Sequence, residues 1–442
     1  MEKTLKELRA ECPVKFVVLD DDPTGTQTVH DVTVITDWEE DSIRAAFSSE
    51  GSLFFILTNS RALLEAETEA LHRTIAGRVS RISEETGIPY LFISRSDSTL
   101  RGHYPLETEV LQETVKADGE ILAPFFLEGG RLTVGDIQYV RQGGKLVPAG
   151  ETEFAKDRTF GYTSSDLKLW VEEKSKGRTK AADVVSLRSE DGEAAIEEKL
   201  MGAKGFNKFV VNASSYEDLE VFALAFFRAL SRGKRFIIRS AASIVKVLGG
   251  ITDIPYLTRE DIASPGNTNG GIVLIGSHVN RTTEQLEELL KLESVTGIEF
   301  NQHRVLEEGG LEDEIGKAVA KAEALISQGR DVVVYTRRQR LDVPGSELKV
   351  STTISDALVQ VIGRLSVRPG FVVAKGGITS SDVATKALGI RRATVMGQAE
   401  AGIPVWRSGE ESKFPGLGYV IFPGNVGEAS TLRKVVENLS NN

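Results

Sequence analysis

The stretch Phe16-Val17-Val18-Leu19-Asp20-Asp21-Asp22-Pro23-Thr24-Gly25 joins a short apolar run to three consecutive carboxylates and a turn. A run that is apolar at every position is typical of a strand buried on both faces of a parallel sheet. Gly25 then permits a tight turn directly after the acids. Ligands of open α/β sheets bind beyond the carboxyl ends of the strands, so this stretch indicates both a fold class and a place for chemistry.

The same kind of apolar run recurs along the chain, separated by stretches with helical periodicity. In the first half the runs lie at residues 53–57, 90–93, 120–123, 209–211 and 236–238. In the second half they lie at residues 272–275, 297–300, 332–335, 371–374, 393–396 and 419–422. Buried strands alternating with helices predict parallel sheets covered on both faces. Residues 129–178 are less regular and are expected to form an excursion from the first sheet.

The length of 442 residues is too great for one ordinary hydrophobic core. The stretch 258–271 interrupts the alternation with Asp, Pro, Asn and Gly, which is the composition of a loop or linker. We therefore expect two α/β domains, at residues 1–257 and 268–442. Each is predicted to be a mainly parallel sheet flanked by helices, with the active site in the crevice between the domains.

The composition limits the partners of the chain. Lys and Arg number 53 against 64 Asp and Glu, a net charge of −11, which argues against a nucleic-acid or membrane partner. No apolar run approaches the roughly 20 residues that span a bilayer. The N-terminal residues lack a signal-peptide core, and Cys12 is the only cysteine. A cytoplasmic location is the expectation, and the oligomeric state stays open, with a homodimer as one possibility.

Polar residues follow three of the apolar runs in the first half: the three aspartates at 20–22, the segment 58–61, which ends in Arg61, and the segment 94–103. Carboxylates at a strand end can bind a cation, accept hydrogen bonds from hydroxyls or act as a general base. Arg guanidiniums bind carboxylates or phosphates, and Ser and Thr hydroxyls suit a polyol. An acidic turn and a helix cap at Asp97 and Ser98 are the structural alternatives. The combination favours a small anionic polyhydroxy ligand.

Three glycine-bearing turns follow strands in the second half, at residues 276–280, 375–382 and 423–427. Turns of this kind offer backbone N–H groups and a positive helix end to phosphate oxygens. One such turn is weak support for a nucleotide site, whereas three in one domain favour it. The chain has no P-loop motif, no His-Glu-x-x-His motif and no Gly-x-Ser-x-Gly motif, which excludes an ordinary P-loop enzyme.

Three motifs occur in a fixed order: Asp-Asp-x-Thr-Gly at 21–25, Asp-Ser-Thr-Leu-Arg-Gly at 97–102 and Gly-Gly-x-Thr at 376–379. With the Pro…Gly-Arg stretch at 124–131, they make the chain resemble the four-carbon acid sugar kinase family from about Phe16 to Gly427. The chain departs from the family pattern at Arg95, where many members have Lys, and at Ile378, where Glu is usual. It also has Pro-Gly-Asn-Val-Gly at 423–427 where Lys-Ser-Gly-Asn-Phe-Gly is usual.

The resemblance implies a kinase that uses ATP and Mg²⁺ to phosphorylate the terminal hydroxyl of an acid such as threonate, erythronate or 3-oxo-tetronate. It implies an N-terminal substrate domain and a C-terminal nucleotide domain. The residues implied to face the sugar acid are Asp21, Asp22, Arg61, Arg95, Asp97 and Ser98, and Ser96 and Arg101 of the same polar segment are also expected there. The residues implied to face ATP are Ser277, Gly376, Gly377, Ile378, Thr379 and Gly424.

The expected mechanism assigns Asp22, or its neighbour Asp21, as the acceptor of the hydroxyl proton. Arg61, Arg95 or Arg101 is expected to hold the substrate carboxylate, and the protein ligands of Mg²⁺ are left unassigned. Two other classes stay open. One is a lyase or hydrolase that acts on a sugar acid, with Asp21 and Asp22 binding a metal. The other is a nucleotide- or metabolite-binding module without catalysis.

Overall fold

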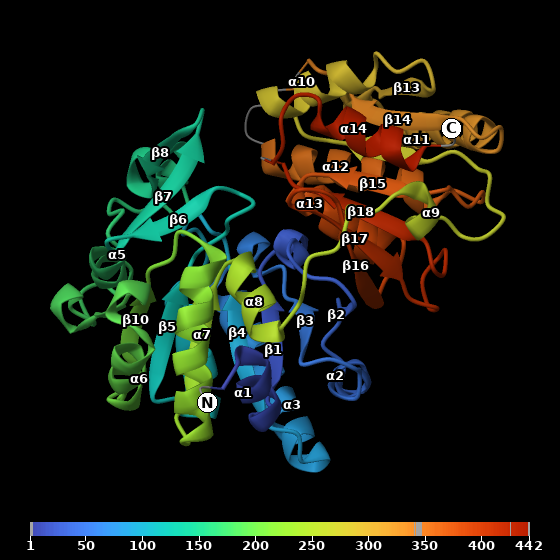
Figure 1. The fold of residues 1–442 in the computed structure, drawn as a ribbon. Helices are drawn as coiled ribbons and strands as arrows, with labels where there is room; N and C mark the ends of the chain where they lie inside the picture. The colour runs from blue at the N-terminus through green and yellow to red at the C-terminus, as the bar shows by residue number, and fades with distance from the viewer. Residues whose placement is uncertain (1–2, 340, 342–346, 425, 441–442) are drawn as a thin grey trace. The chain divides into compact units, whose positions relative to one another are not determined.

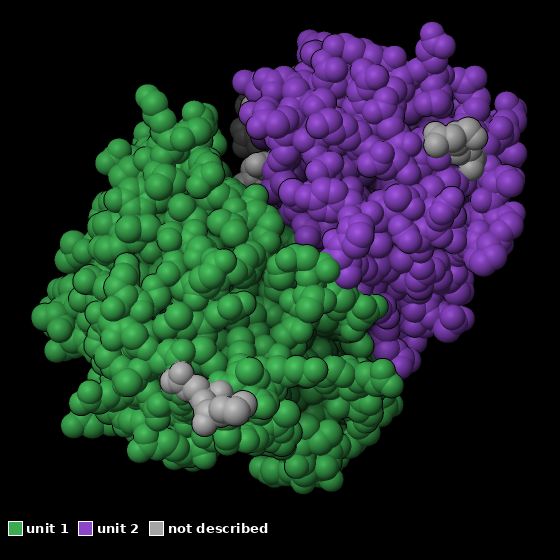
Figure 2. All heavy atoms as spheres, in the orientation of Figure 1, with its two compact units in different colours: residues 1–253 green, residues 254–442 purple. Residues whose placement is uncertain are grey.

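A computed structural model describes residues 3–339, 341, 347–424 and 426–440. The chain forms two compact units, unit 1 (Met1–Asp253) and unit 2 (Ile254–Asn442), which Figure 2 shows in different colours. The linker-like stretch singled out in the sequence, 258–271, begins a few residues after this division. Each unit is described by itself, and the predicted position of the active site between the domains stays a prediction.

Unit 1 is built on a parallel sheet with the strand order β2-β3-β1-β4-β11-β5-β10-β9 (Figure 1). Its strands are β1 (Lys15–Asp20), β2 (Val32–Ile35), β3 (Leu53–Leu57), β4 (Tyr90–Arg95), β5 (Gly119–Ala123), β9 (Val185–Leu187), β10 (Asn207–Val211) and β11 (Phe236–Ser240). In the backbone register of the sheet, Asp20 lies opposite Leu57 of β3 and Arg95 of β4, and Arg95 lies opposite Ser240 of β11. The carboxyl ends of β1, β3, β4 and β11 therefore share one edge.

Helices cover both faces of this sheet: α1 (Leu5–Glu11), α2 (Glu40–Phe47), α3 (Glu65–Thr86), α4 (Leu106–Val115), α6 (Glu193–Met201), α7 (Tyr216–Ser231) and α8 (Ala242–Gly249). Phe16 of β1 makes an edge-to-face contact with Phe227 of α7 at 6.2 Å between ring centroids. The next residue, Val17, points the other way and packs in a core cluster with side chains of α2, α3 and α4. Because side chains alternate along a strand, helices on both faces explain why the whole run is apolar.

The excursion predicted at residues 129–178 contains a separate antiparallel sheet of β6 (Arg131–Val134), β7 (Ile137–Gln142) and β8 (Lys145–Pro148), followed by α5 (Leu167–Lys174). Val140 of β7 and Trp170 of α5 pack in one buried cluster with Leu122 of the main sheet. The excursion is thus attached to unit 1 through an apolar core of its own.

Unit 2 has the strand order β13-β14-β12-β15-β18-β17-β16. Its strands are β12 (Ile272–Ile275), β13 (Val295–Phe300), β14 (Asp331–Thr336), β15 (Val372–Lys375), β16 (Arg392–Glu400), β17 (Ile403–Ser408) and β18 (Gly418–Phe422). The first five strands in the order are parallel, while β17 runs antiparallel to β18 and to β16. Two mainly parallel sheets with flanking helices confirm the α/β prediction.

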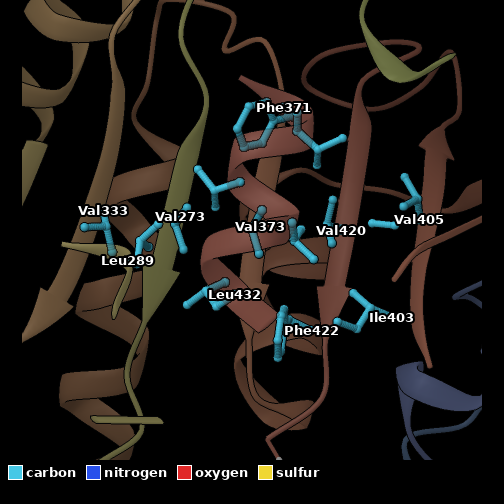
Figure 3. Close-up of a cluster of buried hydrophobic side chains, with 14 of the residues drawn as sticks. Val273, Leu289, Val333, Phe371, Val373, Ile403, Val405, Val420, Phe422 and Leu432 are labelled. Carbon is cyan, nitrogen blue, oxygen red and sulfur yellow. The ribbon is translucent and has the colours of Figure 1, made fainter. Parts of the chain in front are cut away.

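The helices of unit 2 are α9 (Arg259–Ile262), α10 (Asn280–Leu289), α11 (Gly310–Ile326), α12 (Glu347–Gly363), α13 (Gly377–Asp382) and α14 (Thr431–Leu439). Figure 3 shows one face of the sheet, where side chains of neighbouring strands form a row that includes Val273, Val373 and Val420. Leu289 of α10 and Leu432 of α14 cover this row. Among the described helices, none combines the length and the apolar character needed to cross a membrane.

Candidate functional site

The three aspartates of unit 1 occupy different environments at the end of β1. Asp20 and Asp21 are buried, with 2% of each side chain exposed, whereas 17% of the Asp22 side chain is exposed. Asp22 begins the short 3-10 helix at Pro23–Thr26, and its Oδ1 accepts hydrogen bonds from the backbone N–H of Thr24, at 2.7 Å, and from the Thr24 hydroxyl. A Cβ atom on Gly25 would lie only 2.0 Å from the Asp20 carboxylate, so the turn requires glycine.

Arg61 binds two of these aspartates. Its Nε and Nη2 donate to the two oxygens of Asp21 at 3.1 and 2.6 Å, a bidentate arrangement, and its Nη1 lies 3.1 Å from Asp22 Oδ2. Arg61 follows β3 within a short helical turn at Ser60–Ala62. Residues 40 positions apart are thereby joined at neighbouring strand ends, and the aspartate charges are largely neutralised within the protein.

Arg95, the last residue of β4, lies on the other side of β1. Its Nη1 is 3.4 Å from Asp20 Oδ1 and 3.6 Å from Asp21 Oδ1, and its Nη2 donates to Gln27 Oε1 at 3.1 Å. The guanidinium is almost fully buried. Arg95 is therefore a fixed counter-ion of the buried aspartates.

The polar segment after β4 folds back on itself through Asp97. Arg101 Nε donates to Asp97 Oδ2 at 2.6 Å, and the Thr99 hydroxyl donates to the same oxygen. Ser96 donates to Glu107 Oε2 at 3.4 Å, and Ser60 donates to Glu107 Oε1 at 2.6 Å. Glu107 is buried and was not singled out in the sequence, where it reads as an ordinary helical residue.

Ser98 is the predicted substrate residue that has the least direct connection with this cluster. It is buried, and its backbone carbonyl accepts a hydrogen bond from Gln138 Nε2 of β7 at 2.8 Å. The structure thus links Asp21, Asp22, Arg61 and Arg95 directly, while Ser98 anchors the antiparallel excursion.

The pKa values of the aspartates diverge because burial and counter-ions act unequally. Burial raises the pKa of Asp20 well above its usual value, and the nearby Arg95 charge offsets this only in part. Burial also raises the pKa of Asp21, despite its contact with Arg61. Burial acts in the same direction on Asp22 and Asp97, but arginine charges outweigh it, and the pKa of each lies below the usual value.

A further guanidinium, Arg239 of β11, lies beside the cluster and was missed as a site residue. It is 2% exposed, and its Nη2 donates to the backbone carbonyl of Arg101 at 3.2 Å. Its guanidinium carbon lies 5.3 and 5.2 Å from the ring centroids of Tyr104 and Trp170. No carboxylate pairs with Arg239 in the described part of the chain, and its Nε is buried without a partner. A buried cation without a counter-ion is expensive unless a ligand supplies one.

Gly102 connects Arg239 with the aspartates. Its φ of 119° lies in a region that favours glycine. A Cβ atom there would lie 3.4 Å from Asp21 Oδ2 and 3.6 Å from Arg239 Nη2. The backbone at Gly102 is therefore close to both the acidic and the basic group.

In unit 2, the three glycine-bearing turns follow adjacent strands, because β12 pairs with β15 and β15 pairs with β18. A Cβ atom on Gly276 would lie 3.6 Å from Thr379 Oγ1, and one on Gly424 would lie 4.0 Å from the Cα atom of Gly376. The first turn therefore approaches the second at Gly276 and Thr379, and the third approaches the second at Gly424 and Gly376. Asn425, in the third turn, lies outside the described residues.

The other predicted nucleotide residues lie in the same turns. Gly376, with φ 110°, immediately precedes α13, which begins at Gly377. Ile378 is 64% exposed, so its side chain is accessible at the second turn. Ser277 Oγ accepts a hydrogen bond from the backbone N–H of Val279 at 3.3 Å and so shapes the first turn.

Lys375, the residue before the Gly-Gly pair, lies in the second glycine-bearing turn but was not predicted as a site residue. It is fully buried, and its Nζ donates to the Pro423 carbonyl at 3.3 Å and lies 4.4 Å from the centroid of the Phe422 ring. Burial, with a smaller contribution from the Arg281 charge, lowers the pKa of Lys375 to about 7. Its burial comes from the tertiary fold, so the sequence carries no signal that distinguishes it from other lysines.

Within the described ranges, no three His, Cys, Asp or Glu side chains form a cluster that could hold a metal ion. The aspartates of unit 1 face arginines instead. A metal held mainly by phosphate oxygens and water is compatible with this arrangement, because Mg²⁺ commonly uses few protein carboxylates.

Comparison with protein families assigns both parts of the chain. Residues 16–248 match the family model of a sugar-binding N-terminal domain, and residues 272–432 match that of a nucleotide-binding C-terminal domain. No curated protein sequence matches the chain.

Two solved structures are similar in fold over nearly the whole chain. The Haemophilus influenzae protein HI1011 has a TM-score of 0.64 at 18% identity and covers 96% of this chain and 100% of its own. A protein of Salmonella typhimurium LT2 has a TM-score of 0.70 at 16% identity and covers 95% of this chain and 98% of its own. At these identities the likeness shows a shared fold.

Proposed function

Because the chain belongs to the four-carbon acid sugar kinase family, we propose that it transfers the γ-phosphoryl group of ATP to the terminal hydroxyl of a four-carbon sugar acid. The observation that carries the proposal is the presence of a sugar-binding and a nucleotide-binding domain in one chain. Threonate, erythronate and 3-oxo-tetronate are the proposed substrates. Unit 1 binds the acid, and unit 2 binds the nucleotide.

Recognition of the acid rests on the cationic groups of unit 1. Arg61 and Arg95 are each paired with two aspartates, so their first role is to hold these carboxylates in place. Arg101 is likewise paired with two aspartates, Asp97 at 2.6 Å and Asp157 at 3.8 Å. Within the described chain no carboxylate pairs with Arg239, which donates one side-chain hydrogen bond although a guanidinium has five N–H groups. We assign the substrate carboxylate to Arg239, with Arg101, whose backbone carbonyl bonds to Arg239, as a second contact. Ser96, Asp97 and Ser98 complete the polar surroundings.

Asp22 is the proposed acceptor of the hydroxyl proton, because it is the most exposed of the three aspartates. The hydroxyl oxygen bonds to the γ-phosphorus while the bond between that phosphorus and the bridging oxygen breaks, and ADP leaves. The low pKa of Asp22 keeps it ionised but makes it a weak base. A loose transition state needs little proton removal early in the reaction, so a weak, well-placed base is sufficient.

The phosphates are assigned to the turns of unit 2, through Ser277, Gly376, Gly377, Ile378, Thr379 and Gly424. Backbone N–H groups in glycine turns suit phosphate oxygens because no Cβ atom blocks the approach. Mg²⁺ bound with the nucleotide would neutralise charge on the phosphate oxygens. The side chains of the chain itself supply orientation and the proton acceptor.

The experiment that tests the proposal is ADP release with ATP and Mg²⁺ across a panel of four-carbon acids and the corresponding neutral polyols. The expected result is ADP release with one or a few acids and none with the neutral polyols. Consumption of an acid without nucleotide would support a lyase or hydrolase instead. Binding of both ligands without a product, under conditions that span pH and metal, would support a non-catalytic module.

A further inference from the structure

Lys375 carries a buried amine that the proposed mechanism does not yet use. It ends β15 with no exposed surface, and its Nζ has one hydrogen bond, to the carbonyl of Pro423 at 3.3 Å. In the described residues no carboxylate pairs with it. An apolar side chain of similar length would fill the same space without the cost of burying an amine, so packing alone does not account for lysine here.

The surroundings of Lys375 are poor in negative charge. Arg281 of α10 is a second cation close enough to act on it. On α13, the only carboxylate is Asp382, which pairs with Lys386 at 3.1 Å between Nζ and Oδ1. The described strands beside β15, which are β12 and β18, contain no charged side chain. Without a ligand, neither α13 nor these described strands therefore offers the Lys375 amine an unpaired carboxylate.

Lys375 lies next to two of the glycine-bearing turns that are proposed to bind phosphate. The next residue is Gly376, whose Cα atom lies beside the turn of Gly424, and the single acceptor of Lys375 is the carbonyl of the residue before Gly424. The amine thus lies where two of the three turns meet. A phosphate seated on these turns would bring the missing negative charge next to the amine.

We propose that Lys375 binds a phosphate group of the nucleotide and takes up a proton from solvent as the nucleotide binds. This inference rests on the proposed function, since it requires that unit 2 binds ATP. In the free protein the amine is neutral above neutral pH, because burial disfavours its charged form. In the complex the phosphate favours the ammonium form, and the proton is supplied by the buffer.

The test is isothermal titration of the full chain with ATP at pH 8, in two buffers that differ in ionisation enthalpy. The expected result is uptake of close to one proton per nucleotide, because Lys375 would be mostly neutral before binding. Lys375→Met should abolish this uptake and weaken ATP binding by about 10- to 100-fold, the size expected for a lost charged hydrogen bond. Binding of adenosine, which has no phosphate, should be unchanged.

Two further variants serve as controls. Lys375→Arg keeps a charge at every pH, so it should bind ATP without proton uptake at pH 8. Lys291→Met removes an exposed lysine that pairs with Glu288, and it should retain both affinity and uptake. At pH 6, where Lys375 is already protonated, the difference in proton uptake between the unmodified chain and Lys375→Met should fall nearly to zero.

A measurement without nucleotide shows whether the Lys375→Met variant folds. The folded protein lowers the pKa of Lys375, so the unfolded chain binds the Lys375 proton more tightly. The resulting loss of unfolding free energy is full below about pH 7, and it shrinks as the pH rises toward the ordinary pKa of lysine. Lys375→Met should therefore melt at a higher temperature than the unmodified chain, with a larger gain at pH 6 than at pH 10.

Two results together would overturn the inference but leave the kinase proposal intact: ATP binding by the unmodified chain without proton uptake, and unchanged ATP affinity in the folded Met variant. Failure of the unmodified chain to bind ATP would overturn both.

Discussion

At the carboxyl edge of its sheet, unit 1 has three aspartates paired with arginines, whereas unit 2 has three glycine-bearing turns and one buried lysine. In unit 1 the charges largely neutralise one another, as in the bidentate contact of Arg61 with Asp21. In unit 2 the amine of Lys375 has only a carbonyl partner. The aspartate cluster of unit 1 is thus fixed in advance by internal ion pairs, whereas Lys375 of unit 2, like Arg239 of unit 1, leaves a basic group for the ligand to complete.

The difference has consequences for mutation. Changes in unit 1 should alter the orientation of catalytic groups and the stability of the fold, because its charged residues depend on each other. Changes in the turns of unit 2 should act mainly on nucleotide affinity, because backbone groups do the binding. The four predictions that follow test this contrast.

The largest effect is expected from Asp22→Asn in unit 1. The substitution keeps the size of the side chain and the oxygen that accepts hydrogen bonds from Thr24, but it removes the carboxylate that accepts the substrate proton. The kcat should therefore fall by about 10²–10⁴-fold with both ligands still bound. Asp21→Asn should reduce kcat less if Asp21 chiefly orients Arg61. Single-turnover phosphorylation of Asn variants at 21, 22 and 97 measures the three effects. Near-full rate in Asp22→Asn beside an inactive variant at Asp21 or Asp97 would reassign the base.

In unit 2, Gly376→Ala places a side chain on a backbone with φ 110°, where only glycine is unstrained, and it distorts the turn. ATP affinity should fall by about 10-fold or more, while binding of the acid should not change. Gly389→Ala is the matched control, since Gly389 also has a positive φ but no neighbour within 4 Å. Equal loss of ATP affinity in both variants, measured by calorimetry, would argue for general strain rather than a phosphate site.

Arg239→Met tests whether the unpaired guanidinium of unit 1 recognises the acid. The KM for the acid should rise by about 10- to 100-fold because a charged hydrogen bond is lost, and the KM for ATP should stay the same. Arg232→Met, which removes an exposed arginine paired with Glu197, is the control. An unchanged KM for the acid in a folded Arg239→Met protein would return carboxylate binding to Arg61, Arg95 or Arg101.

The smallest effect concerns stability rather than turnover. The arginine charges near Asp97 lower its pKa despite its burial, so its contribution to stability is present above the unfolded value of about 3.9 and is lost as the pH falls below it. Asp97→Asn should lose about 1.5–3 kcal/mol of unfolding free energy at pH 7 and progressively less below pH 4. Asp183→Asn, at an exposed aspartate, should change little. Urea titrations at several pH values make the comparison, and a pH-independent loss would contradict it.

Much of the fold could be predicted from local patterns. The apolar run 16–19 corresponds to β1 at Lys15–Asp20, and the run 371–374 corresponds closely to β15 at Val372–Lys375. The antiparallel strand β17 was missed, because a single strand of six residues leaves little periodicity in the sequence. The sheet at Arg131–Pro148 was expected only as an irregular excursion, since its short strands are joined by Gly-rich turns that carry no signal for the main sheet.

The site was less predictable because its chemistry depends on partners far apart in the sequence. Arg61 was expected to bind substrate, and its position 40 residues from Asp21 gave no indication of their ion pair. Three adjacent carboxylates in a sequence suggest that mutual repulsion governs their pKa values. Burial is instead the largest cause of the raised pKa of Asp20 and Asp21, and the degree of burial is set by the tertiary fold. Arg239 and Lys375 were missed for the same reason.

The most direct measurement is the fate of the γ-phosphoryl group, followed with ATP labelled at that position in the presence of Mg²⁺ and each four-carbon acid. The account predicts that the label appears on the terminal oxygen of the acid, in an amount equal to the ADP formed. Label found only as inorganic phosphate, or loss of the acid without any transfer of label, would contradict the assignment of this chain as a sugar-acid kinase.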